Sequence, residues 1–268
     1  MIALVLKIVG FVVGAVAIWA LAGQALNYFV THKQQRSPTH LYWLTWMREI
    51  FWCSLSVFVW PLGFIPASQT VVAGAPIVLL HGYLSNRSCM WILAWRLRQK
   101  GYQNIVALNF WPPFSSMEVL AHDLNAKIRA LAQTSKDVVV IAHSMGGLVA
   151  RRALSQDPSL PISKIITLGT PHAGTLLAHT AIGENGRQMR PHSQFLRGFT
   201  GSSDLMFTVA SRHDNVAIPY TAALCGSNTL LVEGVGHMSL LADRRVLEKV
   251  CDALPAPADV VIHTTCRA

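Results

Sequence analysis

The feature that most constrains the fold is a short apolar run that ends in a serine between small residues. Residues 138–141 are all Val or Ile, which is typical of a buried parallel strand. Residues 142–147 then read Ala-His-Ser-Met-Gly-Gly, and a helix-forming sequence follows. A strand, a tight turn and a helix with Ser144 at the apex form a nucleophile elbow. The turn is strained, so the flanking positions must be small, and Ala142 and Gly146 meet this requirement.

A serine hydroxyl is a weak nucleophile unless a histidine base and an orienting carboxylate accompany it. In this kind of fold the carboxylate and then the histidine follow the serine along the chain. Asp214 and His237 each come directly after a predicted strand, and the carboxyl ends of parallel strands share one edge of a sheet. We therefore predict that Ser144, His237 and Asp214 form a catalytic triad. Asp204 is the rival acid, but it precedes its strand and should lie at the opposite edge.

An earlier apolar run, at residues 76–80, leads into His81-Gly82-Tyr83. A glycine there lets the backbone pass close to a substrate. We predict that the backbone N–H groups of Tyr83 and Met145 form an oxyanion hole, which would stabilise the negative oxygen of an acyl-transfer intermediate. The His81 side chain is expected to bond to the backbone instead.

Residues 173–203 follow a predicted strand at 162–168 and contain no strand pattern. A crossover connection needs only about a dozen residues, so we predict a small lid, with an ordinary crossover helix and loops as the alternative. The five cysteines have no zinc-like spacing. The histidines in this region lack carboxylates at ligand-like spacing. No metal and no cofactor is predicted.

The first seventy residues differ from the rest of the chain. Residues 8–30 carry no charge and exceed the roughly 20 residues that a transmembrane helix needs. A cleaved signal peptide is the alternative, with a small-residue site at 20–22, but the apolar run continues beyond that site. We favour a retained anchor in a domain at residues 1–70, followed by a catalytic domain at 71–268.

A second apolar segment, at residues 50–66, is rich in Trp and Phe. It either spans the membrane or lies in its surface, and a helix packed against the catalytic domain is the third alternative. Lys33, Arg36 and Arg48 lie between the two apolar segments. The positive-inside rule therefore places the segment between them on the cytoplasmic side of a bacterial inner membrane. The short length and Pro61 favour the flat arrangement, which keeps the catalytic domain cytoplasmic. Two spans would place it outside.

The chain carries a net charge of +9, which raises the question of nucleic-acid binding. No basic run or nucleic-acid motif supports that partner, whereas anionic lipid headgroups fit an anchored chain. The sequence leaves the oligomeric state open.

Residues 76–254 resemble the α/β-hydrolase superfamily, and in particular bacterial lipases and esterases. The resemblance rests on Leu-His-Gly-Tyr at 80–83, the serine turn at 142–147, Gly-Thr-Pro-His-Ala-Gly at 169–174, and the segments around Asp214 and His237. The superfamily commonly has glycine where this chain has Ala142. The resemblance implies a mostly parallel sheet with helices on both faces. It also implies a serine mechanism and an ester or lipid substrate.

Three functions are compatible with this pattern. The first is a membrane-anchored hydrolase of carboxylic esters. The second is an acyltransferase, thioesterase or amidase that uses the same triad. The third is a non-catalytic membrane-binding module on a hydrolase scaffold, which would have no need of all three triad residues. Fold alone does not separate them.

Overall fold

A computed structural model describes residues 2–31, 38–66, 74–133, 137–199 and 204–257. Six parallel strands form one sheet in the order β2-β1-β3-β4-β5-β6. The strands are β1 (Ile77–Leu80), β2 (Ile105–Leu108), β3 (Val138–His143), β4 (Ile162–Leu168), β5 (Met206–Ser211) and β6 (Thr229–Val232). The strand order reverses between β1 and β3, and the carboxyl ends of the central strands lie at one edge. Open α/β sheets place their sites at this edge.

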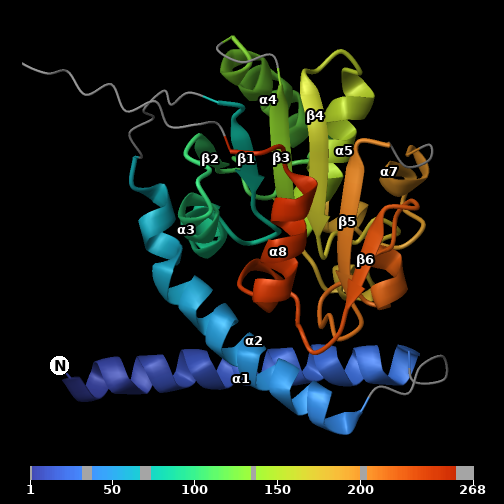
Figure 1. The fold of residues 1–268 in the computed structure, drawn as a ribbon. Helices are drawn as coiled ribbons and strands as arrows, with labels where there is room; N and C mark the ends of the chain where they lie inside the picture. Colours follow the sequence, from blue (N-terminus) through green and yellow to red (C-terminus); the bar gives the residue numbers. More distant parts are fainter. Residues whose placement is uncertain (1, 32–37, 67–73, 134–136, 200–203, 258–268) are drawn as a thin grey trace, which may run out of the picture.

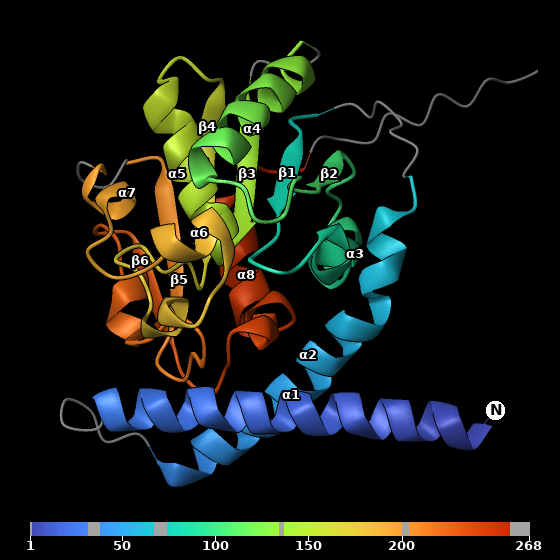
Figure 2. The same ribbon diagram turned by 180° about the vertical axis from the view of Figure 1, so that it is seen from behind.

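Helices cover both faces of the sheet, which confirms the predicted fold class (Figures 1 and 2). The longer helices of the catalytic domain are α3 (Trp91–Gln99), α4 (Met117–Leu131), α5 (Met145–Gln156) and α8 (Arg244–Ala253). The α4 and α5 helices pack on one face, where they meet Val78, Leu80 and Val140. The α3 and α8 helices pack on the other, against Leu79 and Ile141. Neighbouring residues of a strand thus enter opposite cores, which explains why the strands are apolar throughout.

The segment predicted as a lid contains short helices in its described part, up to residue 199. These are η3 (Leu176–His179), α6 (Gly183–Gln188) and α7 (Gln194–Arg197). The Tyr83 hydroxyl donates to the carbonyl of Ile182 at 2.8 Å. The segment therefore contacts the turn after β1, which is one of the predicted site turns. Residues 200–203 of the predicted lid lie outside the described residues.

In Figure 1, α1 (Ile2–Thr31) lies along the foot of the molecule, and α2 (Thr39–Val59) crosses it and rises toward α3. Gln24 Nε2 donates to the carbonyl of His213 at 2.9 Å, and Asn27 Nδ2 donates to that of Arg212 at 2.8 Å. Both carbonyls belong to the loop after β5. The α1 helix is therefore docked on the carboxyl edge of the sheet.

The second apolar segment is part of a longer helix. The α2 helix begins at Thr39, eleven residues before the apolar segment at 50–66, and the short helix η1 (Trp60–Phe64) follows it. Arg48 lies inside this helix, and its guanidinium donates to the carbonyl of Gly234 at 3.0 Å. Lys33 and Arg36, the other basic residues between the two apolar segments, lie outside the described residues.

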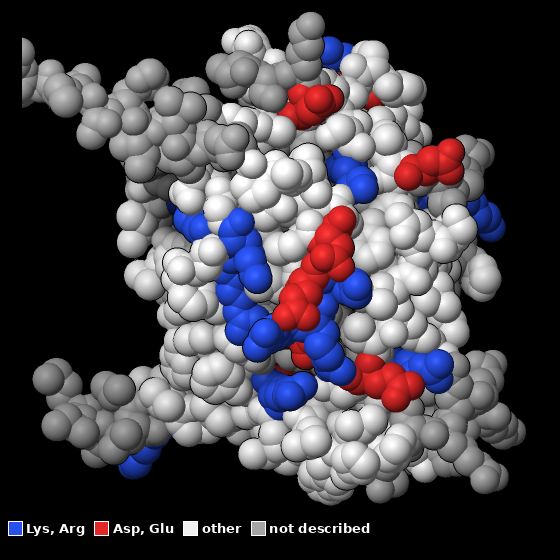
Figure 3. All heavy atoms as spheres, viewed as in Figure 1, with Lys and Arg blue, Asp and Glu red and all other residues white. Residues whose placement is uncertain are grey.

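The outward faces of α1 and α2 are apolar. Their exposed large side chains are Ile8, Phe11, Ile18, Trp19, Leu21, Phe29 and Val30 on α1, and Trp43, Leu44, Met47, Phe51, Leu55, Val57 and Phe58 on α2. Figure 3 shows how charged side chains are distributed on one face of the molecule. They gather over its middle, and the foot is mostly uncharged. Among the described residues, α1 is the one helix long and apolar enough to cross a membrane.

Candidate active site

Ser144 lies at the strained turn between β3 and α5. Its backbone has φ 56° and ψ −128°, a region that residues with a side chain rarely adopt. The Ser144 N–H donates to the carbonyl of Leu168 at 2.9 Å, which ties the turn to the end of β4. A Cβ at Gly146 would lie 2.7 Å from the carbonyl oxygen of His81. Glycine is therefore required for α5 to start this close to the turn after β1.

Asp214 and His237 come together at the same edge. His237 Nδ1 lies 3.0 and 2.9 Å from the two carboxylate oxygens of Asp214. Oδ1 of Asp214 also accepts the N–H groups of Val216 and Ala217, both at 2.8 Å. Asp214 is fully buried, and Ser144 and His237 are only 5% and 4% exposed. The carboxylate is thus held in one orientation against the imidazole.

The environment of His237 favours its charged form. Burial opposes the charge, but the Asp214 carboxylate and its hydrogen bond outweigh burial and, with help from Glu49, raise the His237 pKa above its ordinary value of 6.5. This raises the basicity of the ring. A base that must take a proton from a serine hydroxyl needs that property.

The residue before the serine also contacts this histidine. The rings of His143 and His237 lie 4.6 Å apart, and His143 Nε2 lies 3.1 Å from the carbonyl oxygen of His237. Burial, followed by the neighbouring His237, lowers the pKa of His143 well below its usual range. His143 is therefore neutral and donates from Nε2. It links the serine turn to the His237 loop.

The turn after β1 approaches Ser144 from the other side. A Cβ at Gly82 would lie 2.8 Å from Ser144 Cβ and 3.3 Å from its Oγ. The adjoining Tyr83 N–H is one predicted oxyanion donor, and Met145, the other, begins α5 directly after Ser144. The His81 side chain bonds to the backbone as predicted, since its Nε2 accepts the N–H of Phe110 at 3.0 Å.

The rival acid lies elsewhere. Asp204 is exposed and precedes β5, whereas Asp214 follows the carboxyl end of that strand. Of the two carboxylates, the structure brings only Asp214 to His237.

Sequence reasoning missed two residues that contact the His237 loop. The Asn215 side-chain oxygen accepts the His237 N–H at 3.1 Å. Glu49, from α2, accepts the N–H groups of Met238 and Ser239 at 3.0 and 2.8 Å. Asn215 adjoins Asp214, so its position next to the predicted acid was a signal that could have found it. Glu49 gives no local signal, because the contact exists only once α2 has docked.

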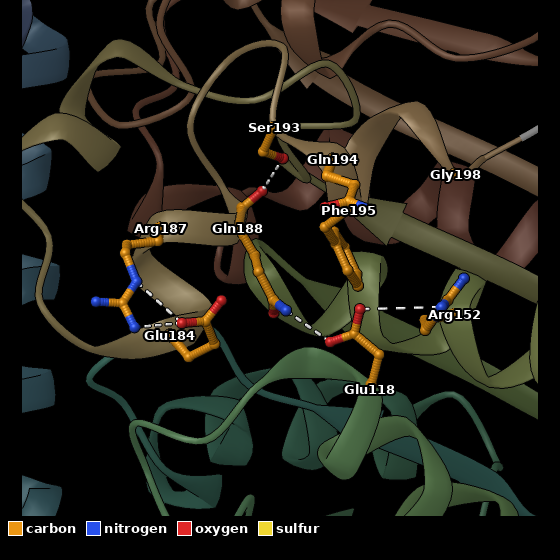
Figure 4. Close-up of a pocket in the computed structure, with 9 residues that line it drawn as sticks. All are labelled: Glu118, Arg152, Glu184, Arg187, Gln188, Ser193, Gln194, Phe195 and Gly198. Atoms are coloured by element: carbon orange, nitrogen blue, oxygen red, sulfur yellow. Dashed lines mark hydrogen bonds and ion pairs between the residues drawn. The ribbon is translucent and has the colours of Figure 1, made fainter.

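A cavity of about 640 Å³ lies away from this edge, between α4, α5, α6 and α7 (Figure 4). Its polar side chains pair with one another: Arg187 with Glu184, and Gln188 with Glu118. None of the triad candidates lines it. Within the described ranges, no group of three or more His, Cys, Asp or Glu side chains is arranged to hold a metal ion.

Solved structures with the same architecture are found among lipases and esterases. Mature lipase BlEst2 from Bacillus licheniformis aligns with a TM-score of 0.53 and 19% identity, over 70% of this chain and 94% of that one. An esterase from Exiguobacterium antarcticum gives 0.53 and 16%, over 68% and 92%. The chain has the α/β-hydrolase fold.

A longer lipase and a family model each match part of this chain. Lipase B from Aspergillus fumigatus aligns with the hydrolase fold of this chain at a TM-score of 0.55 and 18% identity, over 62% of this chain. This chain spans about half of that lipase, 49% of its length. The family model described as "PGAP1-like alpha/beta domain" matches residues 115–187, which include Ser144. A search of curated proteins finds no match.

Proposed function

We propose that this α/β-hydrolase is a membrane-anchored serine hydrolase of carboxylic esters, with lipid-like esters as substrates. The observation that carries the proposal is the buried contact between Asp214 and His237, at the same sheet edge as the strained turn of Ser144. The solved structures with this fold include proteins described as lipases and an esterase. A binding module would gain nothing from burying an ionisable pair beside a strained serine, since both features cost free energy.

In the proposed mechanism, neutral His237 takes the proton of Ser144 as its Oγ attacks the ester carbonyl. Asp214 keeps the Nδ1 proton in place and stabilises the imidazolium. The N–H groups of Tyr83 and Met145 receive the oxyanion. Protonated His237 then gives its proton to the departing alcohol. Water, activated by the same histidine, finally hydrolyses the acyl-enzyme, and no cofactor is needed for any step.

We further propose that α1 is retained rather than cleaved. The Trp46 indole N–H donates to the carbonyl of Ala17 at 3.0 Å, and Gln24 and Asn27 bond to the loop that carries Asp214. Cleavage at residues 20–22 would remove the Ala17 carbonyl and cut the helix just before Gln24 and Asn27. The α1 helix therefore serves as an anchor that is also part of the folded domain.

We propose that α2 lies in the membrane surface and does not cross the bilayer. Its inner face buries Thr45, Glu49 and Cys53 against the protein, while the opposite face is apolar and exposed. A helix held along one side in this way suits an interfacial position. Because α1 and α2 both pack at the carboxyl edge, this arrangement turns the site of Ser144 toward lipid.

A flat α2 keeps the catalytic domain on the cytoplasmic side, where the positive-inside rule places the segment before it. Labelling of intact spheroplasts with an impermeant thiol reagent tests this placement. We expect a cysteine introduced at exposed Lys249 to stay unlabelled until the cells are opened. Labelling of intact cells would establish two spans and an external domain.

Substrate profiling of the full-length protein in detergent tests the reaction itself. We expect turnover of p-nitrophenyl esters that depends on acyl-chain length, and the Ser144→Ala variant should lose about 10⁴-fold or more in kcat. Ser163→Ala, a change on β4 outside the site, should keep the parent rate. Faster turnover of matched thioesters, or transfer to an added alcohol in preference to water, would favour the thioesterase or acyltransferase alternative.

A further inference from the structure

Glu49 is a fully buried carboxylate in the middle of α2. Its Oε2 accepts the N–H of Met238 at 3.0 Å, and its Oε1 accepts the N–H of Ser239 at 2.8 Å. These two residues directly follow His237. The Cys53 thiol, one turn further along α2, donates to Oε2 at 3.7 Å. The carboxylate is thus bound on the protein side of the helix and has no contact with solvent.

Gly236, which precedes His237, packs directly against the Glu49 side chain. A Cβ at Gly236 would overlap the Cγ and carboxyl carbon of Glu49, so no larger residue fits there while α2 stays in place. The Gly236 N–H donates to Ser239 Oγ at 2.8 Å, which closes the loop on itself. Glu49 therefore holds the backbone on both sides of His237.

The chemistry of the contact calls for a carboxylate. Two separate N–H donors point at two separate oxygens, and an amide of the same size has only one oxygen. With Gln at this position, an NH₂ group would face one of the donors. A buried charge is costly unless it is well paired, and docking of α2 alone does not need it. Arg48 already joins α2 to Gly234, and Gln24 and Asn27 join α1 to the neighbouring loop.

We propose that Glu49 is a positioning residue for His237: it fixes the loop so that the ring keeps Nδ1 on Asp214 and presents Nε2 toward Ser144. This inference rests on the proposed serine mechanism. It makes α2 a part of the catalytic apparatus as well as a membrane-facing helix.

The charges around His237 support this role. Asp214 faces Nδ1 from the loop after β5, neutral His143 contacts the ring in a tilted arrangement from the end of β3, and Glu49 adds negative charge from α2. Burial raises the pKa of Glu49, and the N–H groups of Met238 and Ser239 oppose that rise. Burial also raises the pKa of the Cys53 thiol, which stays neutral. After Asp214, Glu49 is the second carboxylate whose charge raises the His237 pKa.

The test is the Glu49→Gln variant of the full-length protein in detergent, assayed with p-nitrophenyl butyrate across pH. We expect kcat to fall by about 100-fold, as for a displaced catalytic group, with little change in KM. Loss of the negative charge should also move the acid limb of kcat/KM to lower pH. Glu248→Gln removes an exposed carboxylate from α8 and should match the parent in both respects.

The outcomes separate this proposal from the proposed function. If Ser144→Ala is inactive while Glu49→Gln keeps the parent kcat and acid limb, the serine mechanism stands and the positioning role is overturned. A lower kcat with an unmoved acid limb also overturns it, because general loosening of the loop would give that result. If Ser144→Ala keeps its activity, the proposed function fails whatever Glu49 does.

Glu49→Asp provides the conservative variant and covers the case in which the Gln variant does not fold. It keeps the charge and both oxygens on a side chain shorter by one methylene. We expect the acid limb at the parent position and a kcat between those of the parent and Glu49→Gln. An unchanged kcat in Glu49→Asp would overturn the requirement for this geometry.

Discussion

The catalytic domain and the α1–α2 pair distribute their side chains in opposite ways. In the catalytic domain, apolar side chains fill two cores on the two faces of the sheet, and exposed charges pair on helices such as α8. In the helix pair, polar side chains such as Gln24, Asn27 and Glu49 are buried, and large apolar ones face outward. Exposed apolar side chains gathered on one face are typical of a site of association. The difference indicates that the two regions are built for different surroundings.

The same comparison explains why the inner face of the pair is polar. The α1 and α2 helices dock on loops at the carboxyl edge, where backbone N–H and C=O groups have no strand partners. Gln24 and Asn27 satisfy two carbonyls there, and Glu49 satisfies two N–H groups. Each of these groups would carry a desolvation penalty if left unpaired. Docking therefore places the α1–α2 pair directly against the loops that carry Asp214 and His237.

If the two regions have separate roles, changes at the carboxyl edge should affect turnover and leave membrane binding intact. Asp214→Asn should reduce kcat by about 10⁴-fold, because the imidazole loses its tautomer and its charge partner. Asp204→Asn, an exposed position before β5, should match the parent. Steady-state kinetics with a p-nitrophenyl ester measures both. The reverse ranking would assign the acid to Asp204.

The pH profile gives a graded version of the same test. Only neutral His237 accepts the serine proton, and Asp214 raises its pKa above 6.5. Activity is therefore full above that pKa and is lost as the pH falls through it. We expect the midpoint of the acid limb of kcat/KM above pH 6.5, with about tenfold loss for each further unit. A profile that stays flat well below 6.5 would show that no such base acts.

Changes on the outer face of α2 should weaken membrane binding and leave turnover intact. Phe51→Glu places a charge in the exposed apolar stripe and should weaken binding to anionic vesicles by roughly tenfold or more, since burial of one such side chain is worth about 1.5–3 kcal/mol. Turnover of a soluble ester should not change. Val119→Glu alters an exposed apolar residue of α4 and should bind as the parent does. Flotation with vesicles measures the difference.

Salt tests the nature of the same attachment. The full-length protein should stay in the membrane fraction through a high-salt wash, because salt does not screen apolar burial. Release of most of the protein would mean that the basic charge of the chain, and not the apolar surface, holds it there.

The smallest expected effect concerns the polar inner face. Asn27→Ala removes the donor to the Arg212 carbonyl and should lower the free energy of unfolding by about 1–3 kcal/mol. Phe29→Ala, which removes an outward-facing side chain two positions away, should leave it unchanged in detergent. Thermal denaturation of the two variants in the same micelles compares them directly. Equal stability of both would mean that the inner face of α1 adds nothing to folding.

The sheet and the triad candidates were predictable because each depends on a short local pattern. The apolar runs before Ser144, Asp214 and His237 mark strands, and their carboxyl ends must meet at one edge. The start of α2 at Thr39 was not predicted, because Arg48 was placed between the two apolar segments. Its charge is instead accommodated by the Gly234 carbonyl, on a loop far along the chain. Glu49 was missed for the same reason, since its partner Met238 lies 189 positions away.

The most direct test of the central claim is reaction of the full-length protein with a fluorophosphonate, followed by intact-mass measurement and peptide mapping. An activated serine takes one phosphonyl group, whereas unactivated hydroxyls do not react. We expect a single adduct on Ser144 that is absent from Ser144→Ala and strongly slowed in Asp214→Asn. No adduct on the folded protein, or an adduct on a different serine, would contradict the assignment of Ser144 as the nucleophile.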